Sequence, residues 1–164
     1  MKDLLFIEIC HNEYHALIQM LRKEISICSE ELWNKEIDEP PFWQQAYHTI
    51  YYLDFYLGDN PKKPPNRFEM KENLNEKKDS ILTKQQLLEY LSEVEKKCDQ
   101  VLKELTMEKI EGKNSYFWTG PTLAHRLIYN IRHSQHHIGR LNSILRRHMG
   151  DVSKWIITIK DEEK

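Results

Sequence analysis

Residues 3–33 form the first long pattern of alternating apolar and polar positions. The apolar side chains recur at steps of three and four, at Ile7, Tyr14, Ile18, Leu21, Ile25, Cys28 and Leu32. This period is typical of an α-helix that buries one face. The pattern therefore predicts a first helix from about Asp3 to Trp33.

Two further helices are predicted in the middle of the chain. The second follows Asp38-Glu39-Pro40-Pro41, because proline is tolerated in a first helical turn, and it runs to Leu57 before the stop signal Gly58. The third opens with a capping box, in which Thr83 is followed three residues later by Gln86. Its apolar stripe is the cleanest in the chain, at Leu87, Leu91, Val94, Cys98, Val101 and Leu105.

The fourth predicted helix begins near Gly120-Pro121-Thr122, continues through Met149 and ends at Gly150. No apolar run of period two interrupts the helices, so the sequence predicts an all-α fold. The connection 58–82, rich in Pro, Lys and Asn, is long enough to run the length of a bundle. We therefore predict a four-helix bundle with a long connection between its second and third helices.

The length of 164 residues suits one domain with a core that needs no disulfides. We assign residues 1–150 to this bundle domain. The tail 151–164 is too apolar for a solvated appendix, and we expect it to pack on the bundle or to join an oligomer contact. Its apolar residues are Val152, Trp155, Ile156, Ile157 and Ile159.

The charge balance favours no anionic partner. Formal net charge is −2, with 24 basic and 26 acidic residues, which argues against nucleic acid or an anionic membrane surface as a partner. No stretch approaches the roughly 20 apolar residues of a membrane span, and the N-terminal residues do not resemble a signal peptide. The charged runs at 71–79 and 93–97 are interpreted as solvated surface. Three cysteines without a C-x-x-C pair suit buried thiols in a reducing compartment, so we expect a cytoplasmic protein.

Histidines supply the candidate chemistry. Two pairs stand four residues apart, His11 with His15 and His133 with His137, and a four-residue step returns to nearly the same helix face. Both pairs lie at the border of an apolar stripe, so spacing alone does not choose between them, and a chance pairing is the plain alternative. A third nitrogen from a neighbouring helix, with His48 as candidate, would complete a site with an open position, which is typical of catalytic zinc.

The second helix has a polar and aromatic face opposite its apolar one. This face suggests the lining of a pocket, in which Tyr51 or Tyr52 would donate a hydrogen bond to a bound ligand. Simple packing, with hydroxyls at the rim, is the alternative. The face comprises Gln44, Gln45, His48, Tyr51, Tyr52 and Phe55.

Two segments resemble a known family. The stretch 44–54, QQAYHTIYYLD, is similar to the second helix of the DinB-like superfamily. The stretch 131–142, IRHSQHHIGRLN, is similar to that family's fourth-helix signature, a histidine, three residues and a histidine followed closely by Gly-Gln-Leu. Arg140 stands where many members have glutamine, and this departure concerns the surroundings of the ligands rather than the ligands themselves.

The resemblance covers essentially the whole chain and implies an up-down-down-up bundle. It also implies a divalent metal ion, most commonly zinc or nickel, held by His48, His133 and His137. The family offers no matching role for His11 and His15, which we rank lower. His125 and His136 are expected at the surface.

Neutral imidazoles leave the charge of a metal ion uncompensated, so bound water becomes acidic, with a pKa towards ~7 on zinc, and a thiol is deprotonated. Relatives implied by the resemblance include thiol S-transferases that use low-molecular-weight thiols, a thiol-dependent isomerase and hydrolases. The leading hypothesis is a thiol-dependent S-transferase acting on a small molecule. The alternatives are a metal-dependent hydrolase, a non-catalytic metal-binding stress-response module and a purely structural bundle. A homodimer is expected from the apolar tail, and the resemblance to the family implies the same.

Overall fold

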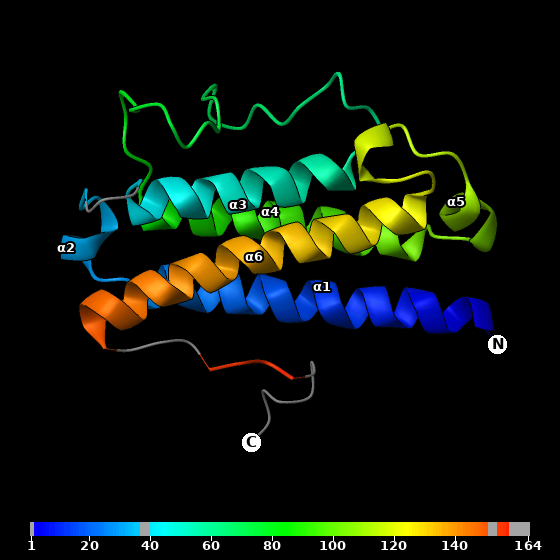
Figure 1. The fold of residues 1–164 in the computed structure, drawn as a ribbon, viewed down its shortest axis with the longest axis horizontal. Coiled ribbons are helices and arrows are strands. Elements are labelled where there is room, and N and C mark those ends of the chain that lie inside the picture. The colour runs from blue at the N-terminus through cyan, green and yellow to red at the C-terminus, as the bar shows by residue number, and fades with distance from the viewer. Residues whose placement is uncertain (1, 37–39, 151–153, 158–164) are drawn as a thin grey trace.

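The structure is a computed structural model that describes residues 2–36, 40–150 and 154–157 (Figure 1). Regular structure in these ranges is helical, apart from an isolated bridge between Lys113 and Thr122. The elements are α1 (Lys2–Ile27), α2 (Glu30–Trp33), α3 (Phe42–Leu57), α4 (Lys84–Lys103), α5 (Met107–Glu111), the 3-10 helix η1 (Phe117–Thr119) and α6 (Leu123–Met149). The predicted all-helical class is therefore confirmed for the described residues.

Four long helices share one core. α3 packs against α6 and α4, and α1 packs against the same two neighbours, so the α3–α6 seam and the α1–α4 seam lie on opposite sides of the core (Figure 1). Apolar positions from each long helix are fully buried, among them Tyr14, Ile18, Leu21, Ile50, Leu53, Leu87, Leu91, Leu127 and Ile138. The order up-down-down-up is a finer statement than this description and stays a prediction.

The long connection after α3 crosses the molecule. In Figure 1 the segment from Gly58 to Thr83 runs back along α3, so that α4 begins near the end at which α3 begins. The predicted capping box is present there: Thr83 Oγ1 accepts from Gln86 N (3.2 Å) and Thr83 N donates to Gln86 Oε1 (2.9 Å). The length of the connection and the capping box at Thr83 were therefore both predicted correctly from the sequence.

The first predicted helix is not continuous. α1 ends at Ile27, and Ser29 starts α2 by accepting a hydrogen bond from Leu32 N (3.2 Å) on its side chain. The prediction of one helix over 3–33 is wrong at this point because serine competes for backbone hydrogen bonds and favours a helix start. Cys28 and Leu32 remain buried across the break, so the apolar period hides it.

The remaining boundaries follow local signals. α3 begins after Pro41 and ends at Leu57, before Gly58, as predicted, whereas Asp38 and Glu39 lie outside the described residues. The short helix α5 was not predicted; Thr106 caps it by accepting from Lys109 N (3.3 Å). α6 ends at Met149, and φ of the following Gly150 is +71°, a left-handed conformation that favours glycine.

The structure also shows the environment of the three cysteines and of part of the C-terminal tail. Cys10, Cys28 and Cys98 are free and buried, and burial raises the pKa of each thiol, to about 11 for Cys10 and about 12 for Cys28.

Of the predicted tail 151–164, the structure describes 154–157, in which Ile156 is buried and Trp155 and Ile157 are exposed. Val152 and Ile159 lie outside the described residues, and the domain assignment stays a prediction. Among the described helices, none combines the length and hydropathy needed to cross a bilayer.

Candidate metal centre

Packing of α3 against α6 brings together the three histidines that the sequence singled out. His48 lies on α3, and His133 and His137 lie on α6. One ring nitrogen from each of the three lies within 4.8 Å of the other two. The ring centroids are 4.5 Å apart for His48 and His137, 4.6 Å for His133 and His137, and 5.9 Å for His48 and His133.

The register between the two helices is fixed by a buried amide. Asn130 on α6 donates from Nδ2 to the carbonyl oxygen of Leu53 on α3 (3.1 Å), and Asn130 is fully buried. A buried amide is costly unless it is hydrogen-bonded, so this contact favours one register over its neighbours. Asn130 lies three residues before His133, so the register that it sets also places His133 beside His48.

A residue from the long connection orients His48. The carboxylate of Glu72 accepts from His48 Nδ1 (2.9 Å) on one oxygen and from the hydroxyl of Tyr52 (2.7 Å) on the other. An ionised carboxylate only accepts, so Nδ1 carries the hydrogen, and in the neutral ring the lone pair is on Nε2. Burial acts to raise the pKa of Glu72, but the hydrogen bonds from His48 and Tyr52 prevail and lower it. A carboxylate behind a ligating imidazole is the usual arrangement at metal sites.

The two histidines of α6 are held in their neutral form. Burial, followed by the repulsion of His48, lowers the pKa of His133 to about 4 and that of His137 to about 3. In the described part of the chain, the buried Nδ1 atoms of both rings have no hydrogen-bond partner. Neutral imidazole is the form that binds a metal ion. The donor set, with its anchored third ring, therefore suits a divalent metal ion.

The polar face of α3 is largely covered by the connection, and Gln44 at its start lines a cavity. Gln44 Nε2 donates to the carbonyl oxygens of Asn73 (3.1 Å) and Glu76 (3.0 Å), and the Tyr47 hydroxyl donates to that of Met70 (2.7 Å). These bonds flank Glu72 on both sides. Gln44, which the sequence analysis placed on a pocket-lining face, thus acts with Tyr47 to hold the segment that delivers the carboxylate.

The two candidate substrate residues have different surroundings. Tyr52 packs edge-on against His48 (centroids 4.8 Å apart) and His133 (5.1 Å), and its hydroxyl is bound to Glu72. Tyr51 packs edge-on against Tyr52 at 5.4 Å. A contact of either residue with substrate stays a prediction.

Glu72 is the residue that sequence reasoning missed. The charged run 71–79 was interpreted as solvated surface, and this is wrong for Glu72 and Lys78, whose side chains are 21% and 6% exposed. A connection without helical or strand period gives no signal for which of its charges turns inward. Only the tertiary placement over α3 makes Glu72 distinct from its neighbours.

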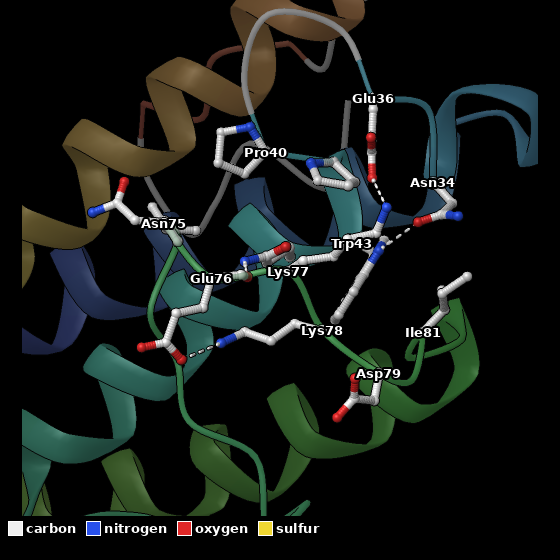
Figure 2. Close-up of a pocket in the computed structure, with 13 residues that line it drawn as sticks. Asn34, Glu36, Pro40, Trp43, Asn75, Glu76, Lys77, Lys78, Asp79 and Ile81 are labelled. Atoms are coloured by element: carbon white, nitrogen blue, oxygen red, sulfur yellow. Dashed lines mark hydrogen bonds and ion pairs between the residues drawn. The ribbon is translucent and has the colours of Figure 1, made fainter.

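One cavity borders the polar face of α3, and another is lined by residues of η1 and α6. Figure 2 shows the larger, about 620 Å³, between the α2–α3 link and residues 74–81, where Lys77 pairs with Glu36 (3.3 Å) and Trp43 donates to Asn34 (2.9 Å). None of the three histidines is among its described lining residues. A smaller cavity of about 350 Å³ includes Tyr129 and Arg132, and the ring of Tyr129 stacks on His133 at 6.1 Å. None of the three histidines is among the described lining residues of the smaller cavity either, but Tyr129 connects it to His133.

The remaining histidines fall into two groups. His125, His136 and His148 are exposed, the first two as predicted. His11 and His15 lie on α1, on the opposite seam, where Asp99 of α4 joins them.

Comparison with known proteins gives the fold a family. The sequence model described as the DinB superfamily matches residues 13–141, a range that contains His48, His133 and His137. A crystal structure described as a conserved protein from Enterococcus faecalis superposes with a TM-score of 0.66 at 16% sequence identity, covering 90% of this chain and 97% of that chain. At this identity the similarity shows a common fold alone. No curated protein matches the sequence.

Proposed function

The chain belongs to the DinB superfamily, and from that premise we propose that it is a divalent-metal-dependent enzyme, in the first place a thiol S-transferase. His48, His133 and His137 hold the metal ion, with zinc or nickel preferred. The observation that carries the proposal is the convergence of three ring nitrogens, each within 4.8 Å of the others, from two helices.

The residues of the site favour activation of a nucleophile. When bound, a divalent ion supplies Lewis acidity that lowers the pKa of a thiol or of water. The three imidazoles add no negative charge that would weaken this effect, and the low pKa values of His133 and His137 keep them neutral at pH 7. In S-transfer the thiol loses its proton, its sulfur forms a bond to an electrophilic carbon, and the leaving group departs with the bonding electrons.

The substrate in this proposal is a small molecule. The cavity lined by Tyr129 and Arg132 has a volume of about 350 Å³, at the low end of the range for small-molecule sites, and Tyr129 stacks on His133. Arg132 gives that cavity a cation, and its guanidinium carbon lies 5.2 Å from the centre of the Tyr129 ring. Tyr51 and Tyr52 remain the proposed substrate contacts from α3. The proposal further includes the up-down-down-up bundle, a cytoplasmic location and a homodimer, without nucleic-acid or membrane partners.

Metal content tests the site directly. Protein purified without a polyhistidine tag is compared with His133→Gln and His137→Gln, with His148→Gln as control because His148 is exposed and outside both histidine clusters. We expect each α6 ligand variant to lose about one metal ion per chain relative to wild type and the control to lose none. Equal metal content in all four proteins, after zinc and nickel have been offered, would overturn the proposal.

Turnover then decides the reaction. The metal-loaded protein is offered bacillithiol, mycothiol or glutathione with an electrophile, and thioether formation is followed. Product that appears only with thiol supports S-transfer. Hydrolysis of an ester or amide without thiol, with water in the place of the thiol, supports the alternative of a metal-dependent hydrolase. Metal binding with neither reaction supports a non-catalytic metal-binding module.

A further inference from the structure

A second group of ligand-type side chains lies on the seam opposite the first. His11 and His15 on α1 and Asp99 on α4 each offer one ligand atom, and these atoms all lie within 4.8 Å of one another. We propose that these three residues form a second divalent-metal site, independent of the proposed function. Nitrogen from two imidazoles and oxygen from a carboxylate is a donor set that suits zinc, nickel, cobalt or copper.

The contacts show side chains already gathered at one point. His15 Nε2 lies 2.8 Å from Asp99 Oδ1, and the rings of His11 and His15 have their centroids 4.3 Å apart. Two donors bound to one ion at roughly 2.1 Å each are at most about 4.2 Å apart. His15 Nε2 and Asp99 Oδ1 lie inside that limit at 2.8 Å, and the 4.8 Å bound on the three ligand atoms is only slightly wider than it, so small side-chain rotations suffice for shared ligation. Nε2 of His15 and the Asp99 carboxylate oxygen would then both bind the ion, and the direct contact between these two atoms would be lost.

The surroundings set the character of the site. The three residues line a cavity of about 410 Å³ together with Ile7, Leu102 and Lys103. Ile7 and Leu102 provide an apolar wall behind the ligands, whereas Lys103 adds a positive charge that opposes a cation. His11 and Asp99 are exposed, and the side chain of His15 is 17% exposed. We therefore infer an exchangeable ion, bound more weakly than at His48, His133 and His137.

Ligand charge separates the two sites chemically. The carboxylate of Asp99 cancels one of the two charges of the ion, so water on this ion is acidified less than water held by three neutral imidazoles. The second site is thus suited to holding a metal ion and less suited to activating a nucleophile.

Four proteins test the proposal: wild type, His11→Gln/His15→Gln, His133→Gln/His137→Gln, and the quadruple variant. Each is dialysed against zinc, and bound metal is counted; cobalt replaces zinc where ligation is to be followed by visible absorption. We expect the His11→Gln/His15→Gln substitutions to remove about one equivalent of bound zinc from wild type. The same loss is expected when they are added to His133→Gln/His137→Gln. The same zinc count with and without His11 and His15 in both backgrounds would overturn the second site.

The design separates the two proposals. Loss of metal only with His11 and His15 supports the second site and overturns the first, and loss only with His133 and His137 does the reverse. Asp99→Asn keeps both histidines and the size of the side chain, so weaker zinc binding in that variant supports ligation by Asp99, and unchanged binding counts against it. His148→Gln is the matched loss of an exposed histidine and should leave the zinc count unchanged. Circular dichroism melts confirm that each variant is folded.

Discussion

The two histidine clusters are built from the same local pattern and differ in what surrounds it. Each has a pair of histidines four residues apart on one helix and a third ligand-type residue on the helix packed against it. The α3–α6 cluster is enclosed, and burial lowers the pKa of both α6 histidines. The α1–α4 cluster is open, with His11 and Asp99 exposed. Helical spacing thus gathers ligands, and the environment decides what a bound ion would do.

The clusters also differ in how their ligands are aimed. In the α3–α6 cluster a residue that is not itself a candidate ligand, Glu72, fixes the ring of His48 from a third segment of the chain. In the α1–α4 cluster His15 is bonded to another candidate ligand, Asp99. An ion entering the first cluster keeps that orienting bond, whereas an ion entering the second must replace it. We therefore expect the first cluster to bind more tightly.

The largest expected difference concerns stabilisation by metal. With zinc at a hundredfold excess over its dissociation constant, binding to the folded state adds about 2.7 kcal/mol to the free energy of unfolding. His137→Gln should lose this stabilisation at the α3–α6 cluster, because it removes a buried ligand. Urea unfolding with zinc and with chelator measures the difference. A zinc effect that survives intact in this variant would show that the clusters are not ranked as we infer.

Glu72→Gln should have the next largest effect. The amide keeps the size of the side chain but loses the charge that anchors the Nδ1 hydrogen of His48, and loss of such a partner costs about 10–100-fold in metal affinity. Competition with a coloured chelator measures the affinity. Glu69→Gln is the control, since Glu69 is an exposed residue of the same connection. Equal affinities in the two variants would mean that Glu72 does not orient the site.

Acid should weaken the metal-free protein through the α3–α6 cluster. Unfolded imidazoles take up protons near pH 6.5, whereas the pKa of folded His133 is about 4 and that of His137 about 3. Between these values the unfolded state binds more protons, so the free energy of unfolding falls as pH is lowered from about 6.5 to 4.

Each α6 histidine should contribute about 2 kcal/mol to that loss after allowance for solvent relaxation. Urea unfolding across this pH range compares wild type with His133→Gln/His137→Gln, because carboxylates titrate in both proteins and their share cancels. The variant should show the shallower dependence. Parallel curves for the two proteins would contradict the enclosed character of the cluster.

The smallest effect is expected at the α1–α4 cluster in the absence of metal. The pair of His15 and Asp99 is partly exposed, with side chains 17% and 51% accessible, and such pairs contribute little. Asp99→Asn should change the free energy of unfolding by less than about 0.5 kcal/mol. Chemical denaturation in chelator measures it. A loss several times larger would mean that Asp99 supports the fold, and its conservative substitution could not then isolate ligation.

The helices and their caps could be predicted from the sequence because the signals that mark them are local. The period of three and four, the capping box at Thr83 and the stop at Gly150 each need only a few neighbouring residues. The break in the first predicted helix at Ser29 was not predicted because the apolar stripe continues across it. Local spacing could not rank the pair at His11 against the pair at His133; only the family resemblance ranked them, and it assigned no role to the former.

What could not be predicted from the sequence was the acidic residue at each cluster. Asp99 and Glu72 reach their histidines from segments 84 and 24 residues away along the chain. Neither residue lies in a motif, and both sit among similar charges. Their positions follow from how α4 and the long connection pack, which no period in the sequence encodes.

The long connection also determines where the chain can be opened. Lys62 and Lys63 are exposed in its first half, away from the bonds between α3 and residues 70–76. New termini placed there would leave Glu72 tied to α3 by the side chains of Gln44 and Tyr47. A cut beside Glu72 would free the carboxylate from the ring it orients. For circular permutation or insertion of a reporter, the two halves of one loop are therefore not equivalent.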